Sequence, residues 1–202
     1  MFDRHLRPLI DPPLNMIGGQ LARTGLTANA VTLIGLAFGL AGAGAIVLGQ
    51  FYLAIALILA SRVADGLDGA VARAHGVTDF GGYLDITSDF VFYAAIPLAF
   101  VLYDPASNGV AGAVLLASFY INGASFLGYA ILAEKKQMRS DSHGVKSLYF
   151  TGGLLEGAET IAFFIALCLW PAWFAPLAYV FAALCALTMA ARLALAARVF
   201  RD

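Results

Sequence analysis

Residues 64–89 read ADGLDGAVARAHGVTDFGGYLDITSD and join two stretches that are hydrophobic enough to cross a membrane. This segment holds five aspartates within 26 residues. An ionised carboxylate is costly to place in hydrocarbon, so acidic residues kept inside membrane helices mark functional sites. We therefore expect a fold of membrane helices organised around an acidic site.

The composition of the whole chain indicates a membrane protein. Of its 202 residues, 61% are hydrophobic and only 12% are charged, and the mean hydropathy is +0.82. A soluble domain of this length cannot bury so much apolar surface. Long apolar runs without strand-like alternation predict an all-α integral membrane protein. The net charge of −1 gives no indication of nucleic-acid binding.

The apolar runs predict six transmembrane helices in one domain, residues 28–202. Three of the turns between them are very short: Gly49-Gln50, residues 104–106 and Pro171. The predicted spans are Ala28–Leu48, Phe51–Ala72, Gly81–Tyr103, Ser107–Ala133, Leu154–Trp170 and Ala172–Val199.

The first 27 residues differ from the rest, with Arg4, Arg7 and Arg23 set among Leu, Ile and Phe. This mixture is typical of an amphipathic helix that lies in the membrane interface. We expect such a helix, a break at Pro12-Pro13 and a second short amphipathic piece. A disordered tail is the alternative.

Basic residues determine the expected orientation in the membrane. All twelve Lys and Arg residues fall on one side of the predicted spans, and the three short turns contain none. By the positive-inside rule, both termini and the longer connectors face the cytoplasm.

Four polar side chains on four different spans share one predicted depth. Asp65, Asp89, Asn122 and Glu156 each lie 14 or 15 residues from the outer end of their span. At about 1.5 Å per residue this is about 21–23 Å, which is close to the cytoplasmic boundary of a hydrocarbon core of about 30 Å. A shared polar cavity that opens to the cytoplasm is the simplest explanation.

The second and third spans each carry an acidic face. Helical periodicity groups Asp65 with Asp68 on one span and Asp85 with Asp89 on the other. Four carboxylates this close need a compensating charge, and hard divalent cations such as Mg²⁺ bind carboxylates together with substrate phosphates. The alternative is that each aspartate sits separately in headgroup water, but the alignment of four favours a shared site.

These residues form a longer pattern, Asp65-x-x-Asp68-Gly69-x-x-Ala72-Arg73, seven further residues, then Gly81-x-x-x-Asp85-x-x-x-Asp89. The pattern resembles the complete signature of the CDP-alcohol phosphotransferases, also called CDP-alcohol phosphatidyltransferases. Members of that family are membrane enzymes that make phospholipids by displacing CMP from a CDP-linked alcohol. The similarity extends along the whole chain and is closest to short members from the bacterial inner membrane.

The resemblance implies a role for each signature residue. Asp65, Asp68 and Asp85 would hold one or two Mg²⁺ or Mn²⁺ ions, and Asp89 would ligate a metal or act as general base on the acceptor hydroxyl. The nucleotide and diphosphate site would be formed by Asn29, Thr32, Asp65, Gly69, Ala72, Arg73 and Gly81. For Asn29 and Thr32 an alternative stays open, because Thr27 or Asn29 is equally suited to cap the first span.

The acceptor is less constrained by the sequence. Family members that use inositol phosphate resemble one another in carrying arginines near the start of the fifth span, where this chain reads GLLEGAET. Glu156 and Glu159 suit a polyol or an amine-bearing alcohol better than an anion. Arg139 and Lys146 in the preceding connector keep glycerol 3-phosphate open. With Asn122, these are the candidate acceptor-binding residues.

The resemblance implies a homodimer in the bacterial inner membrane that moves a phosphatidyl group from CDP-diacylglycerol to a small alcohol. One alternative donor is a CDP-linked choline or ethanolamine, with diacylglycerol as the acceptor. A proton- or cation-coupled transporter is an alternative of another class. Against it, the outer halves of the spans lack ionisable groups and no inverted repeat is visible.

Overall fold

The computed structural model describes residues 3–136 and 157–200, and it contains no β-strand among them. The prediction of an all-α protein is confirmed. In chain order the elements are α1 (Asp3–Arg23), α2 (Ala28–Val47), α3 (Phe51–His75), α4 (Asp79–Tyr103), α5 (Pro105–Lys135), α7 (Gly157–Leu169), the short 3₁₀ helix η1 (Pro171–Trp173) and α8 (Phe174–Val199).

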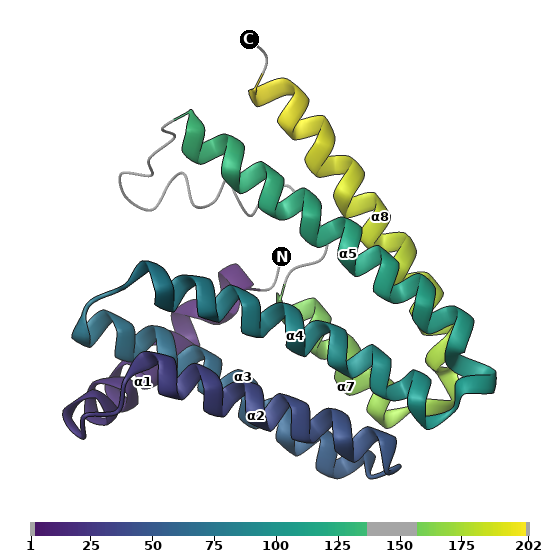
Figure 1. The fold of residues 1–202 in the computed structure, drawn as a ribbon, viewed down its shortest axis with the longest axis horizontal. Helices are drawn as coiled ribbons and strands as arrows, with labels where there is room; N and C mark the ends of the chain where they lie inside the picture. The colour runs from purple at the N-terminus through teal and green to yellow at the C-terminus, as the bar shows by residue number, and fades with distance from the viewer. Residues whose placement is uncertain (1–2, 137–156, 201–202) are drawn as a thin grey trace.

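The helices form two groups (Figure 1). In the first group, α2 packs against both α3 and α4, and α1 packs on α3. In the second group, α5 packs along α8. The groups meet where α4 joins α5, and these two helices diverge away from that turn in the view of Figure 1. The signature aspartates belong to the first group, in the halves of α3 and α4 next to the loop that connects them.

Four elements are long and apolar enough to cross a membrane, namely α2, α4, α5 and Pro171–Val199. The helix α7 is apolar but shorter. The helix α3 coincides with the predicted second span, but it carries Arg62, Asp65, Asp68 and Arg73 within its 25 residues. Length and composition therefore support four spans and a shorter apolar helix, and the count of six stays a prediction.

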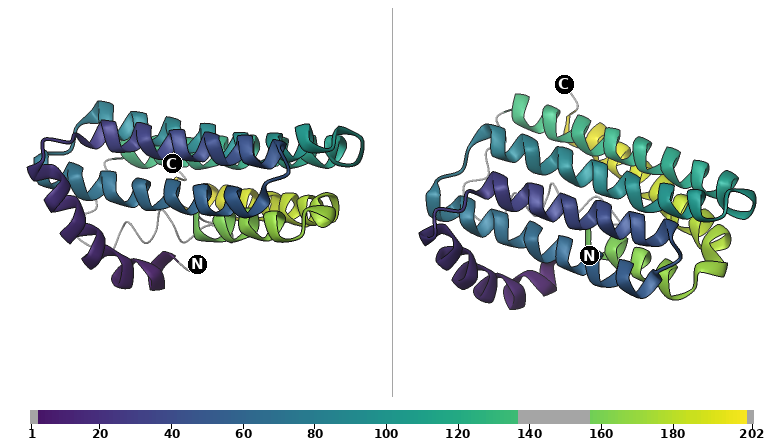
Figure 2. Two further views of the ribbon diagram at one scale, coloured as in Figure 1. Left: turned by 90° about the horizontal axis from the view of Figure 1, so that it is seen from below. Right: turned by 60° about the horizontal axis from the view of Figure 1, so that its bottom comes forward.

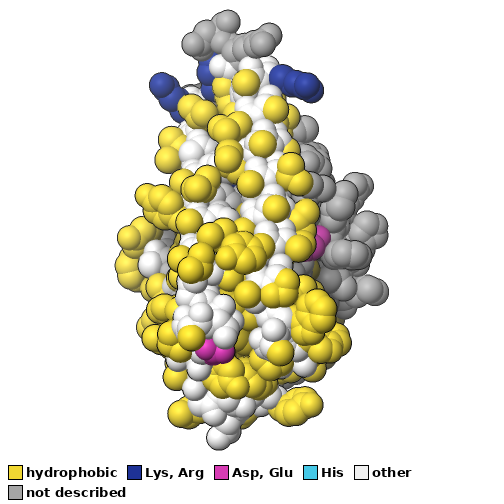
Figure 3. Space-filling view, turned by 90° about the vertical axis from the view of Figure 1, so that its right-hand side faces the viewer, with side chains coloured by type: hydrophobic (Ala, Val, Ile, Leu, Met, Phe, Trp, Pro, Cys, Tyr) yellow, Lys and Arg dark blue, Asp and Glu magenta, His cyan; other side chains and the backbone are white. Residues whose placement is uncertain are grey.

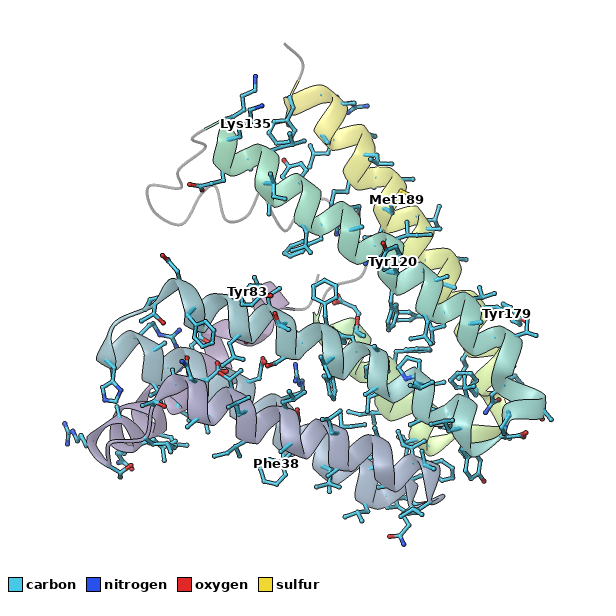
Figure 4. All side chains as sticks on the ribbon, in the orientation of Figure 1. Phe38, Tyr83, Tyr120, Lys135, Tyr179 and Met189 are labelled. Atoms are coloured by element: carbon cyan, nitrogen blue, oxygen red, sulfur yellow. The ribbon has the colours of Figure 1, made fainter. Side chains whose placement is uncertain are left out.

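The surface of the helices is largely apolar. On the face shown in Figure 3, hydrophobic side chains are spread along the described helices and the visible Lys and Arg side chains gather at one end. Phe38 on α2 and Tyr179 on α8 point away from the molecule in different directions (Figure 4). Both are large and well exposed, as expected of side chains that contact lipid.

The main hydrophobic core joins α4 to α7 and to the start of α8. Phe100 on α4 stacks on Phe174 with ring centroids 5.1 Å apart, and Phe92 on α4 meets Phe164 of α7 at 5.8 Å. All four side chains are fully buried. Because α4 contributes to both pairs, its position relative to α7 and α8 is set by close aromatic packing.

The turns follow from local sequence. Gly49 adopts a positive φ of 71° between α2 and α3, which glycine does without steric cost. Asp104 alone separates α4 from α5, and its carboxylate accepts a hydrogen bond from the backbone N–H of Ser107 at 3.1 Å. The expected three-residue turn at 104–106 is therefore wrong, because Pro105 takes the first helical position, where no N–H partner is needed.

The break predicted at Pro12-Pro13 is also wrong, because α1 continues through both prolines. Figure 2 shows α1 curved rather than interrupted. Proline removes a backbone donor and bends a helix without necessarily ending it. The helix α1 lies against α3, with Gly18 over Ala70.

Gly18→Leu is expected to destabilise the protein by about 1–3 kcal/mol, because the new side chain would overlap Ala70. Gly19→Leu is the matched control, since nothing lies within 4 Å of a Cβ placed at Gly19. The measurement is the thermal unfolding midpoint of each purified variant in detergent. Equal midpoints for the two variants would contradict the packing of α1 on α3.

Candidate active site

Four signature aspartates converge where α3 and α4 face each other. Asp65 and Asp68 come from α3, and Asp85 and Asp89 from α4. Asp68 is buried, whereas the Asp65 and Asp89 side chains remain 37% and 33% exposed. The four carboxylates are close enough for each to repel the other three. This arrangement concentrates negative charge in a partly enclosed site.

Arg62 on α3 spans the distance between the two acidic faces. Its Nη1 donates a hydrogen bond to Asp89 Oδ1 at 2.7 Å and lies 3.5 Å from Asp65 Oδ1. Its Nη2 donates to the hydroxyl of Ser61 at 3.2 Å. The guanidinium carbon lies 4.1 Å from the centroid of the Phe92 ring, an arrangement typical of a cation–π contact. Sequence reasoning counted Arg62 only as a flanking charge.

The start of α2 contributes two of the expected nucleotide-binding residues. The Thr32 hydroxyl donates a hydrogen bond to Asp68 Oδ2 at 2.6 Å. The cap of α2 is Thr27, whose hydroxyl accepts from Ala30 N at 3.3 Å, so Asn29 is not the capping residue. Asn29 instead approaches α4, because a Cβ built on Gly81 would lie 3.2 Å from Asn29 Oδ1. A side chain at position 81 would crowd Asn29 Oδ1 and, at 2.9 Å, the Thr78 hydroxyl oxygen.

The last signature residues of α3 lie beside α1. The Arg73 Nη2 donates a hydrogen bond to Asn15 Oδ1 of α1 at 2.7 Å, and Arg73 is exposed. A Cβ on Gly69 would lie 3.4 Å from Arg73 Nη1, so the small residue leaves room for the guanidinium. His75 ends α3 with its Nε2 3.0 Å from the carbonyl oxygen of Ala22. The helix α1 thus holds the end of α3 that carries the signature.

A pocket opens between α2, α3 and α4 beside the aspartates. Two buried hydroxyl residues, Ser61 and Ser88, belong to its wall and were not predicted as site residues. Their spacing could have indicated them, because Ser61 is one helical turn from Asp65 and Ser88 lies between Asp85 and Asp89. The full lining comprises Thr32, Gly35, Leu36, Ser61, Arg62, Asp65, Asp68 and Ser88.

The donor set suits a hard divalent cation in its chemistry. Carboxylate oxygens are the ligands that Mg²⁺ and Mn²⁺ prefer. In residues 3–136 and 157–200, however, no three His, Cys, Asp or Glu side chains already stand together as a metal-binding group. Two of the four carboxylates already have hydrogen-bond donors, Arg62 at Asp89 and Thr32 at Asp68. The carboxylate oxygens fit a cation, and one of them, Asp89 Oδ1, is paired with Arg62 in this structure.

The expected acceptor-binding residues are only partly described. Asn122 lies on α5, and the ring of Phe90, the residue after Asp89, packs against the adjacent Gly123. Glu159 lies in the first turn of α7. Three further candidates, Arg139, Lys146 and Glu156, fall outside the described residues.

Arg192 on α8 is a polar residue whose contacts sequence reasoning missed. It is buried, and its Nη1 donates to Asn122 Oδ1 at 3.0 Å, to the Asn122 carbonyl oxygen at 3.1 Å and to the Ser125 hydroxyl. The sequence did contain an indication, because Arg192 lies several residues inside an apolar helix. It was counted only as one of the basic residues on the cytoplasmic side. Arg192 connects α8 to the part of α5 that carries Asn122.

Comparison with known proteins gives these residues a family context. A family model described as CDP-alcohol phosphatidyltransferase matches residues 25–198. The chain is 46% identical over 188 residues to the inner membrane protein YnjF of Escherichia coli, covering 93% of this chain and 91% of that protein. The range matched by the family model, residues 25–198, includes the whole segment 64–89.

Solved structures share the fold. A crystal structure of Mycobacterium tuberculosis phosphatidylinositol phosphate synthase with CDP-DAG bound matches with a TM-score of 0.73 at 22% identity, over 94% of this chain and 98% of that chain. The same synthase in complex with manganese and citrate matches with a TM-score of 0.72, also at 22% identity, over 90% and 88% of the two chains.

Proposed function

Because the chain belongs to the CDP-alcohol phosphatidyltransferase family, we propose that it moves a phosphatidyl group from CDP-diacylglycerol to a small hydroxyl-bearing acceptor and releases CMP. Membership makes it a transferase of phosphate-containing groups in phospholipid biosynthesis. One observation carries the specific proposal: α2, α3 and α4 bring Thr32 and the four signature aspartates to one site. A related synthase of this fold has been solved with CDP-DAG bound.

Asp65, Asp68, Asp85 and Asp89 would hold one or two Mg²⁺ or Mn²⁺ ions. A divalent ion bound there supplies Lewis-acid neutralisation of the diphosphate and of the departing CMP. Support comes from the oxygen-rich donor set and from the manganese complex of the related synthase.

Asp89 is proposed as the general base that accepts the proton of the acceptor hydroxyl. Its Oδ1 accepts the Arg62 hydrogen bond, and within the described part of the chain its Oδ2 has no partner. The side chain is 33% exposed, so an acceptor can reach it. A base within hydrogen-bond distance of a hydroxyl raises its nucleophilicity as the bond to phosphorus forms.

The nucleotide and diphosphate would lie along the signature face of α3 and the first turn of α4. Gly69, Ala72 and Gly81 have small or no side chains, so they leave space for a ligand on that surface. Arg73 supplies a guanidinium that suits phosphate oxygens. Asn29 offers amide groups at the same place. The closeness of Gly69 to Arg73 and of Gly81 to Asn29 supports these assignments.

We further propose that the acceptor enters from the side of α5 and α7, where Asn122 and Glu159 lie. The candidate acceptors are a polyol, an amine-bearing alcohol and glycerol 3-phosphate. Arg139, Lys146 and Glu156 are retained as acceptor-binding candidates from the sequence alone.

The apolar helices and the similarity to an inner membrane protein indicate a bacterial inner membrane protein. We propose that both termini and the active site face the cytoplasm, because the basic residues all fall on the same side of the predicted spans. The homodimer implied by the family resemblance stays a prediction.

Thr32→Val is expected to lower Mn²⁺ affinity and CMP release about 10- to 100-fold, because hydrogen bonds that orient metal-ligating groups have effects of this size. Valine keeps the shape of the side chain but cannot donate to Asp68 Oδ2. Thr32→Ser keeps the hydroxyl and should stay close to wild type. Equal losses in both variants would show that packing rather than the hydrogen bond matters.

The proposed function is tested by CMP release from CDP-diacylglycerol with purified protein and Mn²⁺ or Mg²⁺. The acceptor panel is glycerol 3-phosphate, glycerol, inositol, inositol phosphate, serine and choline. CMP formed with one acceptor would establish the reaction and identify the product lipid. If CDP-diacylglycerol neither reacts nor binds while CDP-choline or CDP-ethanolamine reacts with diacylglycerol, the donor assignment is wrong.

A further inference from the structure

The contacts of Arg62 point to a function beyond binding of the donor and the acceptor. Its Nη1 lies 2.7 Å from Asp89 Oδ1 and 3.5 Å from Asp65 Oδ1, so one guanidinium bridges the acidic face of α4 to that of α3. The side chain is only 17% exposed and lies against the Phe92 ring. A largely enclosed guanidinium that lies over an aromatic ring is restrained in position, and it therefore restrains the carboxylates it contacts.

Arg62 is also the positive charge felt by the whole acidic site. It interacts electrostatically with Asp65, Asp68, Asp85 and Asp89. Among the described residues no second cation is bonded to any of these four carboxylates. One positive charge thus offsets part of the repulsion among four negative ones.

The fit of Arg62 is incomplete in one respect. Its Nε is buried and has no hydrogen-bond partner within residues 3–136 and 157–200. A buried N–H without a partner is unfavourable, so the guanidinium is held here by the two carboxylates and the aromatic ring despite this penalty. The attraction between the guanidinium and the carboxylates of Asp65 and Asp89 is electrostatic, so another cation at these carboxylates would weaken it.

We propose that Arg62 is an internal counter-cation that competes with the divalent ion for Asp89 and Asp65. This inference rests on the proposed function, because it needs a metal site at the four aspartates. Both cations use the same carboxylate oxygens, and Arg62 already occupies one of them. Arg62 therefore lowers metal affinity, keeps α3 and α4 together in the absence of an ion, and is a positioning residue for Asp89.

The competition predicts that Arg62→Gln binds Mn²⁺ about 10-fold more tightly than wild type, because removal of a positive charge from the site favours a cation. Glutamine can still donate a hydrogen bond to Asp89, so the variant isolates the charge. Arg62→Lys keeps the charge and should bind Mn²⁺ with nearly wild-type affinity. Arg198→Gln, at an exposed position in the last turn of α8, controls for the change in net charge.

The measurement is a Mn²⁺ titration of each detergent-purified protein, with free Mn²⁺ followed by electron paramagnetic resonance. A second readout is the thermal unfolding midpoint without and with Mn²⁺. We expect Arg62→Gln to have the lower midpoint without Mn²⁺ and the larger rise on adding it. This readout reports on charge compensation whether or not the variant turns over substrate.

Two results would overturn the inference in distinguishable ways. If wild type binds Mn²⁺ but Arg62→Gln binds it equally or more weakly, the competition is wrong and the proposed function stands. If wild type binds no Mn²⁺ at any concentration that supports CMP release, the metal site itself is wrong and the inference is lost with it. Tighter binding in Arg62→Gln alone, and not in Arg62→Lys or Arg198→Gln, would support it.

Discussion

Asp89→Asn should reduce CMP release about 100- to 10,000-fold, the range that a lost general base accounts for. An amide has the size of the carboxylate but cannot accept the proton of the attacking hydroxyl. Its oxygen can still accept the Arg62 hydrogen bond that Asp89 Oδ1 now accepts at 2.7 Å. Three signature aspartates remain, so we expect CDP-diacylglycerol to bind with an affinity within a few-fold of wild type.

The assay combines single-turnover CMP release with a direct binding titration of CDP-diacylglycerol. Asp79→Asn is the matched control, since Asp79 lies exposed in the first turn of the same helix and outside the signature. Turnover close to wild type in Asp89→Asn would show that another group removes the proton. Loss of donor binding together with turnover would indicate that Asp89 acts mainly as a metal ligand.

Asp65→Ala should give a different result, because binding itself should be lost. We expect the affinities for Mn²⁺ and for CDP-diacylglycerol both to fall by at least about 100-fold. Loss of residues that only orient metal ligands lowers affinity about 10- to 100-fold, so loss of a ligand itself should cost at least the upper end of that range. Asp65 is on α3 beside Arg62 and takes part in the mutual repulsion of the four carboxylates. Turnover should fall in parallel because the donor no longer binds.

Thermal unfolding separates this effect from simple misfolding. Without metal, Asp65→Ala removes one of four repelling carboxylates and leaves Arg62 paired with Asp89. The unfolding midpoint without metal should therefore be no lower than that of wild type, while the stabilisation by Mn²⁺ should disappear. A variant that still gains stability from Mn²⁺ as wild type does would exclude Asp65 as a ligand.

These two variants, taken together, distinguish the two roles assigned to the aspartates. One should lose turnover and keep binding, and the other should lose both. The transporter alternative predicts neither pattern, because it involves no CMP release. The same preparations can therefore decide between the enzyme and the transporter.

Much of the helical framework could be predicted from hydropathy and turn chemistry. The helix α2 begins at the predicted Ala28, α3 at the predicted Phe51, and α4 ends at the predicted Tyr103. These boundaries were accessible because apolar runs, Gly49 and Asp104 act through neighbours in the chain. Prediction was poorer at Pro12-Pro13, where the local rule predicts a break. The helix α1 is unbroken there and packs on α3.

The aspartate constellation was also accessible, because periodicity within one helix places side chains on one face. Asp68 follows Asp65 by three positions, and Asp89 follows Asp85 by four. The sequence alone therefore determined the helical class, the acidic faces of two helices and the family signature.

Only the tertiary structure decided which partners those acids have. Arg62 and Asp89 are 27 residues apart, Thr32 and Asp68 are 36 apart, and Arg192 and Asn122 are 70 apart. Each pair forms only when separate helices pack at one register, and a shift of a single turn, about 5.4 Å, would break every one of these contacts. Local periodicity carries no information about that register, so the pairing of charge across helices arises from the packing of the whole fold.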